Sequence, residues 1–267
     1  MIKTINITNI EGLKDLVFEQ KRNEENGRLR SSYFYRGVPD KDFKLVTSLE
    51  RNCKEKAAVL ELPLLENFSK YASIEDPTVN ESIWRAMIMG QHHGLPTRLL
   101  DWTHSILVAL HFANDAAFDS LDQKDCAVWR IDARELNEKL PAEYQEALNA
   151  KRTFIFSVDN LTQVAQTIEK YDEDMGRKAL VTVEPPSIDQ RIVNQYSFFS
   201  ILPKGIYSMD EYLDEYTENT VKYIIDKELR WDLRDMLDQF NINERMIYPG
   251  IDGIAKWLAR HYYVRES

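Results

Sequence analysis

The strands expected in this sequence are short, and they do not alternate with helices in a regular βαβ rhythm. Aromatic and β-branched runs bounded by breaking residues predict strands at 32–37, 126–131, 179–183, 197–202 and 221–225. Parallel strands in a doubly wound sheet each need a crossover connection, usually a helix. The loose order seen here favours an α+β fold instead.

Helical spacing of apolar residues and local capping residues predict the remaining elements. Only 9 Gly and 9 Pro punctuate the chain, and no Ser/Gly/Pro-rich linker or internal repeat divides it. We therefore expect one compact unit at 30–267 behind a helical lead-in at 1–29. The expected helices lie at 8–26, 56–71, 80–90, 105–117, from 132 onward, 227–240 and 251–261.

Charge and composition exclude several classes of protein. The 34 Lys+Arg and 44 Asp+Glu give a formal net charge of −10. That balance disfavours a protein that wraps nucleic acid or binds an anionic membrane, although a local basic pocket stays compatible with it. The best apolar run, Ile106–Ala113, is too short to span a bilayer, and the first residues lack a signal peptide. With Cys53 and Cys126 isolated from any metal-binding spacing, we expect a reduced, soluble, cytoplasmic protein.

The first segment that could carry chemistry is Tyr35-Arg36-Gly37. An arginine at the end of an aromatic strand can present its planar guanidinium to a phosphate or a carboxylate. Gly37 would let a ligand or another backbone approach closely. The alternative is an arginine that pairs with a core carboxylate and stacks on its aromatic neighbours.

The second segment runs from Gln91 to Thr103. His93 could donate to a ligand, while Arg98 and Asp101 could pair with each other or line one pocket. A metal site built on His104, His111 and Asp115 is the competing hypothesis. The usual helical ligand pair is i, i+4 with three or more converging ligands, so we expect no metal here.

The third segment, Asp189 to Ile201, enters an expected strand through a polar turn. Asn194 and Gln195 at the start of that strand could hydrogen-bond a ribose or an amide. A strand cap with core aromatics explains the same pattern. The chain has no GxSxG, no P-loop and no GxGxxG, which excludes typical acyl hydrolases, P-loop nucleotide hydrolysis and classical dinucleotide dehydrogenases.

These segments resemble the FRG domain family, which takes its name from an aromatic-Arg-Gly motif near its start. The resemblance rests on Tyr35-Arg36-Gly37, 91–103, 108–113, 191–195 and the C-terminal block Tyr248–Gly253. The family layout is in turn similar to that of ADP-ribosyltransferases. That similarity implies short, mainly antiparallel strands around a cleft that holds NAD, with NAD as a substrate and no permanently bound cofactor.

The resemblance also implies roles for individual residues. Arg36 would hold the diphosphate or the adenosine ribose, Trp102 or Tyr35 would pack the nicotinamide, and Thr103 would steady a ribose. Transferases commonly carry Glu at the position of Gln195, which leaves Asp101 or Asp189 as candidate carboxylates. The expected catalytic residues are Arg36, Asp101 and Gln195. The expected nucleotide-binding residues are Tyr35, Gly37, His93, Arg98, Trp102 and Thr103.

Two functions follow from the sequence. The first is an ADP-ribosyltransferase-like enzyme, a toxin or defence effector that transfers ADP-ribose from NAD to a macromolecular acceptor. The second is a non-catalytic module that binds a nucleotide or a protein in the same cleft. Gln195 in place of an acid and the acidic stretch 210–215 favour the second, whereas polar residues gathered at turns and strand ends favour the first. Neither involves a membrane.

Overall fold

A computed structural model describes residues 1–22, 27–117 and 121–264 of the chain. Its strands form one mixed eight-stranded sheet in the order β1-β8-β4-β2-β3-β7-β6-β5. The strands are β1 (Lys3–Ile7), β2 (Tyr33–Val38), β3 (Leu99–Thr103), β4 (Cys126–Asp132), β5 (Phe156–Ser157), β6 (Val181–Glu184), β7 (Ser197–Ile201) and β8 (Val221–Ile225).

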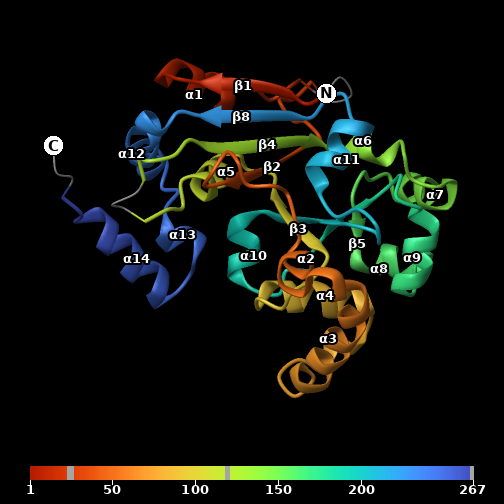
Figure 1. Cartoon of the computed structure of the whole chain (residues 1–267). Coiled ribbons are helices and arrows are strands. Elements are labelled where there is room, and N and C mark those ends of the chain that lie inside the picture. Colours follow the sequence, from red (N-terminus) through yellow and green to blue (C-terminus); the bar gives the residue numbers. More distant parts are fainter. Residues whose placement is uncertain (23–26, 118–120, 265–267) are drawn as a thin grey trace.

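Helices surround this sheet, and different groups of helices lie near its β1-β8 end and near its β6-β5 end (Figure 1). In that view α3 and α4 lie at the bottom, α7 to α9 on the right, and α12 to α14 on the left. The first seven α-helices are α1 (Ile10–Val17), α2 (Ser48–Cys53), α3 (Ala57–Ala72), α4 (Ile83–His92), α5 (Ile106–Ala113), α6 (Ala133–Asn137) and α7 (Ala142–Lys151). The others are α8 (Val158–Val164), α9 (Ile168–Met175), α10 (Gln190–Gln195), α11 (Met209–Tyr216), α12 (Arg230–Gln239), α13 (Glu244–Ile247) and α14 (Ile251–His261), with 3-10 turns η1 (Lys54–Lys56), η2 (Pro77–Asn80) and η4 (Lys227–Leu229).

The sheet is nearly divided at its centre. Strands β2 and β3 share a single bridge pair, Tyr35 with Thr103, whereas β2 and β4 pair over six residues and β3 and β7 over five. In Figure 1, β1, β8 and β4 run side by side while β3 descends at a steep angle to them. We call the junction the seam, with half-sheet β1-β8-β4-β2 on one side and β3-β7-β6-β5 on the other.

Each half-sheet has its own hydrophobic core, and a third core joins them. The first half packs α1, α5 and α12 against one of its faces, and the second half packs α3, α4 and α7 to α9. The third cluster takes residues from β2, β4, β3 and β7 together with α6 and α11. The seam therefore interrupts the hydrogen-bonded ladder, while side-chain packing on the face of α6 and α11 continues across it.

The α+β class is confirmed, and several expected elements need correction. The first residues are not purely helical, because Lys3–Ile7 forms a strand that pairs in parallel with β8, and α1 ends at Val17 rather than near residue 26. The pairs β1–β8 and β5–β6 are parallel, so the sheet is mixed. The helix expected at 80–90 begins later, at Ile83, where the Ser82 side chain caps α4.

None of the helices within the described ranges is both long enough and apolar enough to cross a bilayer.

Candidate functional site

A cavity of about 300 Å³ lies at the seam. We call it the seam cavity. Its walls come from β2, β3, the end of α5, α10 and the start of β7. The lining residues are Tyr35, Arg36, Gly37, Pro39, Asp101, Trp102, Thr103, Phe112, Asp115, Arg191, Gln195 and Ser197. The sequence-predicted Arg36, Asp101, Thr103 and Gln195 are thus brought together, from segments up to 159 positions apart.

Arg36 reaches across the seam from one half-sheet to the other. Its Nη1 donates to the Asp101 carbonyl oxygen at 2.6 Å and lies 3.4 Å from the Asp101 carboxylate. Its Nε has no hydrogen-bond partner among the residues that the structure describes. The side chain is 22% exposed and the Asp101 side chain 54%, so the pair borders solvent. Such a guanidinium keeps donors for an anionic ligand.

Gln91, at the end of α4, fixes the orientation of Asp101. Its Nε2 donates to Asp101 Oδ2 at 3.0 Å, and its Oε1 accepts from the Thr97 hydroxyl at 2.6 Å. A chain of hydrogen bonds therefore runs from Thr97 through Gln91 to Asp101 and on to Arg36. Gln91 begins the second of the three segments that the sequence singles out, but no pattern in the sequence indicates this role.

A second arginine and a second carboxylate stand at the opposite wall. Arg191 of α10 lines the seam cavity, and its guanidinium lies 5.3 Å from the centre of the Tyr248 ring. Asp115 follows the end of α5, and the packing around its carboxyl raises its pKa above the usual range even though part of the residue is open to solvent. The nearby Tyr248 hydroxyl interacts with this carboxyl and acts against the rise of its pKa. The cavity thus holds two cations and two carboxylates.

Gln195 does not begin a strand. It is the last residue of α10, followed by Tyr196 in the left-handed region and then by β7. Its carbonyl accepts the Thr103 hydroxyl at 2.7 Å, and its side-chain amide donates to the Ile247 carbonyl at 3.2 Å. Gln195 and Thr103 therefore hold α10 against β3 and α13. These bonds already occupy the Thr103 hydroxyl and the Gln195 amide nitrogen.

Three residues expected to contact the nucleotide serve the packing of the core instead. The Trp102 indole is 2% exposed and donates to the Ser200 hydroxyl at 2.9 Å. The Tyr35 ring is buried, its hydroxyl accepts from Gln20, and burial raises its pKa. At Gly37 an added Cβ would lie 1.9 Å from the Ala109 carbonyl oxygen, so the glycine admits the backbone of α5.

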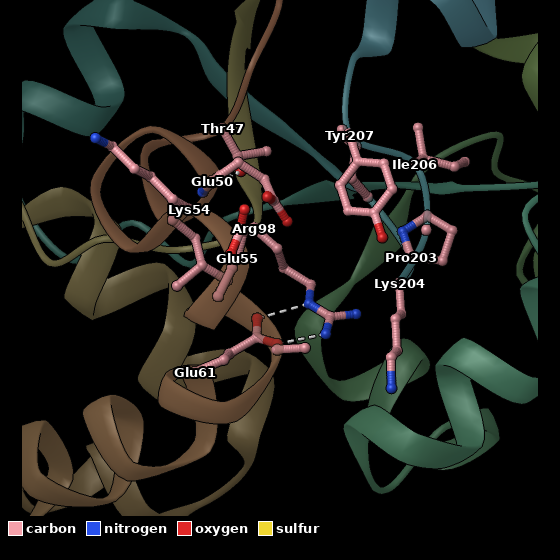
Figure 2. Close-up of a pocket in the computed structure, with 15 residues that line it drawn as sticks. Thr47, Glu50, Lys54, Glu55, Glu61, Arg98, Pro203, Lys204, Ile206 and Tyr207 are labelled. Atoms are coloured by element: carbon pink, nitrogen blue, oxygen red, sulfur yellow. Dashed lines mark hydrogen bonds and ion pairs between the residues drawn. The ribbon is translucent and has the colours of Figure 1, made fainter.

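Arg98 and His93 lie outside the seam cavity. Arg98 is 7% exposed, and its guanidinium binds Glu61 through two bonds and Asp172 on its other side. It forms the floor of a separate cavity of about 420 Å³ between α2–α3 and the loop at 203–207, and Figure 2 shows it turned toward Glu61. The predicted Arg98–Asp101 partnership is therefore wrong. His93 is exposed at the C-cap of α4.

The remaining candidate side chains are also engaged. Asp189 caps α10 and lies 2.5 Å from His92 Nε2, away from the seam cavity lining. His104 packs edge-on against both Phe34 and Phe198. His111 Nδ1 accepts from Arg234, and burial followed by the nearby Arg234 lowers its pKa to about 3. Within the described ranges, no group of three or more His, Cys, Asp or Glu side chains could hold a metal ion.

The seam cavity can be compared with known families at this point. Residues 31–121 match the model of the FRG domain. This match supports the FRG resemblance and takes in β2, β3, α5 and the residues directly after α5, so it includes Arg36, Asp101 and Asp115. Arg191 and Gln195 lie beyond it. No curated protein and no solved structure matches the chain.

Sequence reasoning left several lining residues without a place in the site, chiefly Phe112, Asp115, Arg191 and Ser197. Asp115 entered only as a metal candidate, and Arg191 only through the family block 191–195, as one of three arginines that could form a positive pocket with Arg36 and Arg98. A usable signal did exist for Arg191, since it opens the polar turn that leads to Gln195. No spacing in the sequence could show that the end of the FRG-matching segment folds back against that turn.

Proposed function

We propose that the seam cavity binds a dinucleotide such as NAD, and that the chain transfers ADP-ribose from it to a macromolecular acceptor. The observation that carries this proposal is the placement of Arg36 and Arg191 on the same cavity, at the junction of two half-sheets. Arg36 uses only Nη1 for its contacts with Asp101, and Arg191 lines the cavity with an exposed side chain. Guanidinium groups in this state suit the two phosphates of a dinucleotide.

The wall supports the rest of the ligand as well. Phe112 offers an aromatic face, and Ser197 offers a hydroxyl at the start of β7. Because Trp102 and Tyr35 are buried in the core, we assign the stacking of the nicotinamide to Phe112 instead. A cavity of about 300 Å³ is at the small end of ligand sites, so part of a dinucleotide would extend along the exposed Arg191 side.

The proposed transfer breaks the bond between the ribose C1 and the nicotinamide nitrogen. The nicotinamide leaves with the bonding electron pair, an acceptor atom forms the new bond to C1, and the acceptor proton passes to a base. Positive charge grows on the ribose during this step, so a nearby carboxylate stabilises it. Asp115 is the better placed of the two carboxylates, because Asp101 already accepts from Gln91 and pairs with Arg36.

The test measures NAD binding by titration calorimetry and nicotinamide release by chromatography. Arg36→Ala removes charge-assisted hydrogen bonds of about 1.5–3 kcal/mol, so we expect the affinity for NAD to fall roughly 10- to 100-fold. Arg134→Ala is the matched control, since Arg134 stands on α6 and lines a different cavity. Equal affinity in Arg36→Ala and wild type would remove the basis of the proposal.

A second candidate is binding without transfer. It is favoured by the engagement of Gln195, whose amide is bonded to the Ile247 carbonyl and which carries no charge. Saturable binding of NAD together with no release of nicotinamide, in the presence of cell extract as a source of acceptors, would select this function. The acidic stretch on α11 adds little to it, because Asp210 and Glu211 bind Leu45 N and Lys44 within the same chain.

A further inference from the structure

The C-terminal block Tyr248–Gly253 lies outside the FRG-matching segment and has no role in the function proposed above. It forms the tight turn between α13 and α14. Gly250 has a φ of +107°, and at Gly253 an added Cβ would lie 1.8 Å from the Tyr248 carbonyl oxygen. Both positions therefore require glycine, and together they press the first turn of α14 onto the backbone of Tyr248. The block fixes where Tyr248 stands.

Two cations lie near the Tyr248 ring. The guanidinium of Arg191 lies 5.3 Å from the ring centre and the Lys256 Nζ 5.0 Å. Its hydroxyl interacts with the Asp115 carboxyl and lowers the pKa of that group, against the effect of burial. One side chain thus contacts both an arginine and a carboxylate of the seam cavity, although Tyr248 does not line the cavity itself.

The backbone of the same hairpin is bonded to the helix that carries Arg191. Asn194 Nδ2 donates to the Met246 carbonyl at 2.7 Å, and Gln195 Nε2 donates to the Ile247 carbonyl at 3.2 Å. Helix α10 is only six residues long, so these two bonds and the Tyr248 contact act on its whole length. The hairpin α13–α14 therefore supports the cavity wall formed by α10.

We propose that Tyr248 is a positioning residue of the seam cavity. Its ring orients Arg191 toward the ligand phosphates, and its hydroxyl orients Asp115, so the C-terminal hairpin completes a site that the FRG-matching segment only begins. The ligand in this statement rests on the proposed function. The arrangement of Tyr248, Arg191 and Asp115 does not depend on that function.

Two substitutions separate the two contacts. Tyr248→Phe keeps the aromatic face for Arg191 and removes the hydroxyl from Asp115, whereas Tyr248→Leu removes both. The hydroxyl donates to the carboxylate and so favours its charged form. In Tyr248→Phe, the Asp115 carboxyl should therefore titrate at higher pH than in wild type, as followed by carbon NMR of labelled aspartate. Tyr262→Phe is the control, because Tyr262 is 75% exposed beyond α14.

The NAD titration tests the ring. A cation–π contact of this kind corresponds to about a two- to fivefold change in affinity. We expect Tyr248→Leu to weaken NAD binding by that factor, Tyr248→Phe to leave it nearly unchanged, and Tyr248→Leu to have no effect when Arg191→Ala is already present. A purely structural role would predict the same loss in both backgrounds.

The outcomes are distinguishable. The proposal is overturned if Asp115 titrates identically in Tyr248→Phe and wild type and the loss in Tyr248→Leu persists without Arg191. If wild type binds no NAD, the proposed function fails. A moved Asp115 titration in Tyr248→Phe then still supports the positioning of Asp115, because that measurement needs no ligand.

Discussion

Two of the cavities in this protein each contain an arginine from a conspicuous sequence segment, yet the two arginines are in opposite states. Arg98 forms the floor of the cavity shown in Figure 2, with carboxylates of Glu61 and Asp172 on both sides of its guanidinium. Arg36 at the seam cavity meets one exposed carboxylate through Nη1 alone. Arg98 is therefore part of the scaffold, and Arg36 is available to a ligand. The lesson is that the number of partners decides the role of an arginine.

The largest effect is expected on stability, from the Arg98 side of the comparison. Arg98→Ala leaves Glu61, which is 5% exposed, and Asp172 without a cation, and breaking such a buried pair costs about 3–5 kcal/mol of unfolding free energy. Urea denaturation measures it. A loss below 1 kcal/mol, as for a surface arginine, would show that Arg98 is not a structural arginine, and Arg98 and Arg36 would then not differ in role.

The next effect concerns Gly37, the neighbour of Arg36. Gly37→Ala puts a methyl group against the backbone of Ala109 and Ala113, which should cost about 3 kcal/mol because backbone cannot move aside cheaply. Gly94→Ala is the control: its Cβ would meet open space, so only its φ of +86° opposes the change, at about 1 kcal/mol. If Gly37→Ala had normal stability but no longer bound NAD, the glycine would be needed for the approach of the ligand and not for the packing of α5.

A third prediction places His111 with Arg98 among the scaffold groups. Burial and Arg234 lower its pKa to about 3, so the folded chain keeps it neutral while the unfolded chain binds a proton below about pH 6.5. Its contribution to stability is present above that pH and is lost as the pH falls, by about 1.5–2 kcal/mol between pH 6.5 and 5. His111→Gln should flatten this part of the stability profile. A profile of His111→Gln as steep as that of the wild type would contradict this prediction.

The smallest effect on stability is expected for Arg36. Arg36→Ala should change the free energy of unfolding by less than about 1 kcal/mol, because its partner carboxylate borders solvent. The same variant should lose most of its affinity for NAD. Denaturation and calorimetry on one preparation check both halves, and a stability loss as large as that of Arg98→Ala would show that Arg36 also belongs to the scaffold.

The parts of the fold that follow from local pattern were predictable. The strands at 126–131 and 221–225 and the helix at 251–261 stand where alternation, breakers and helical spacing put them. The strand Lys3–Ile7 was missed because its pairing with β8 joins residues more than 200 positions apart. Likewise, the sequence grouped Arg36, Asp101 and Gln195 correctly, but it could not show that Trp102 turns into the core, since alternation alone does not say which face of a strand is covered.

The seam also has a mechanical consequence. One bridge pair is a weak resistance to shear between the half-sheets, and the contacts of Arg36 with Asp101 add a side-chain link across the seam. Arg36 belongs to one half, and Arg191, on the helix that leads into β7, belongs to the other. An anion bound by both arginines would therefore link the two half-sheets, and its release would remove that link.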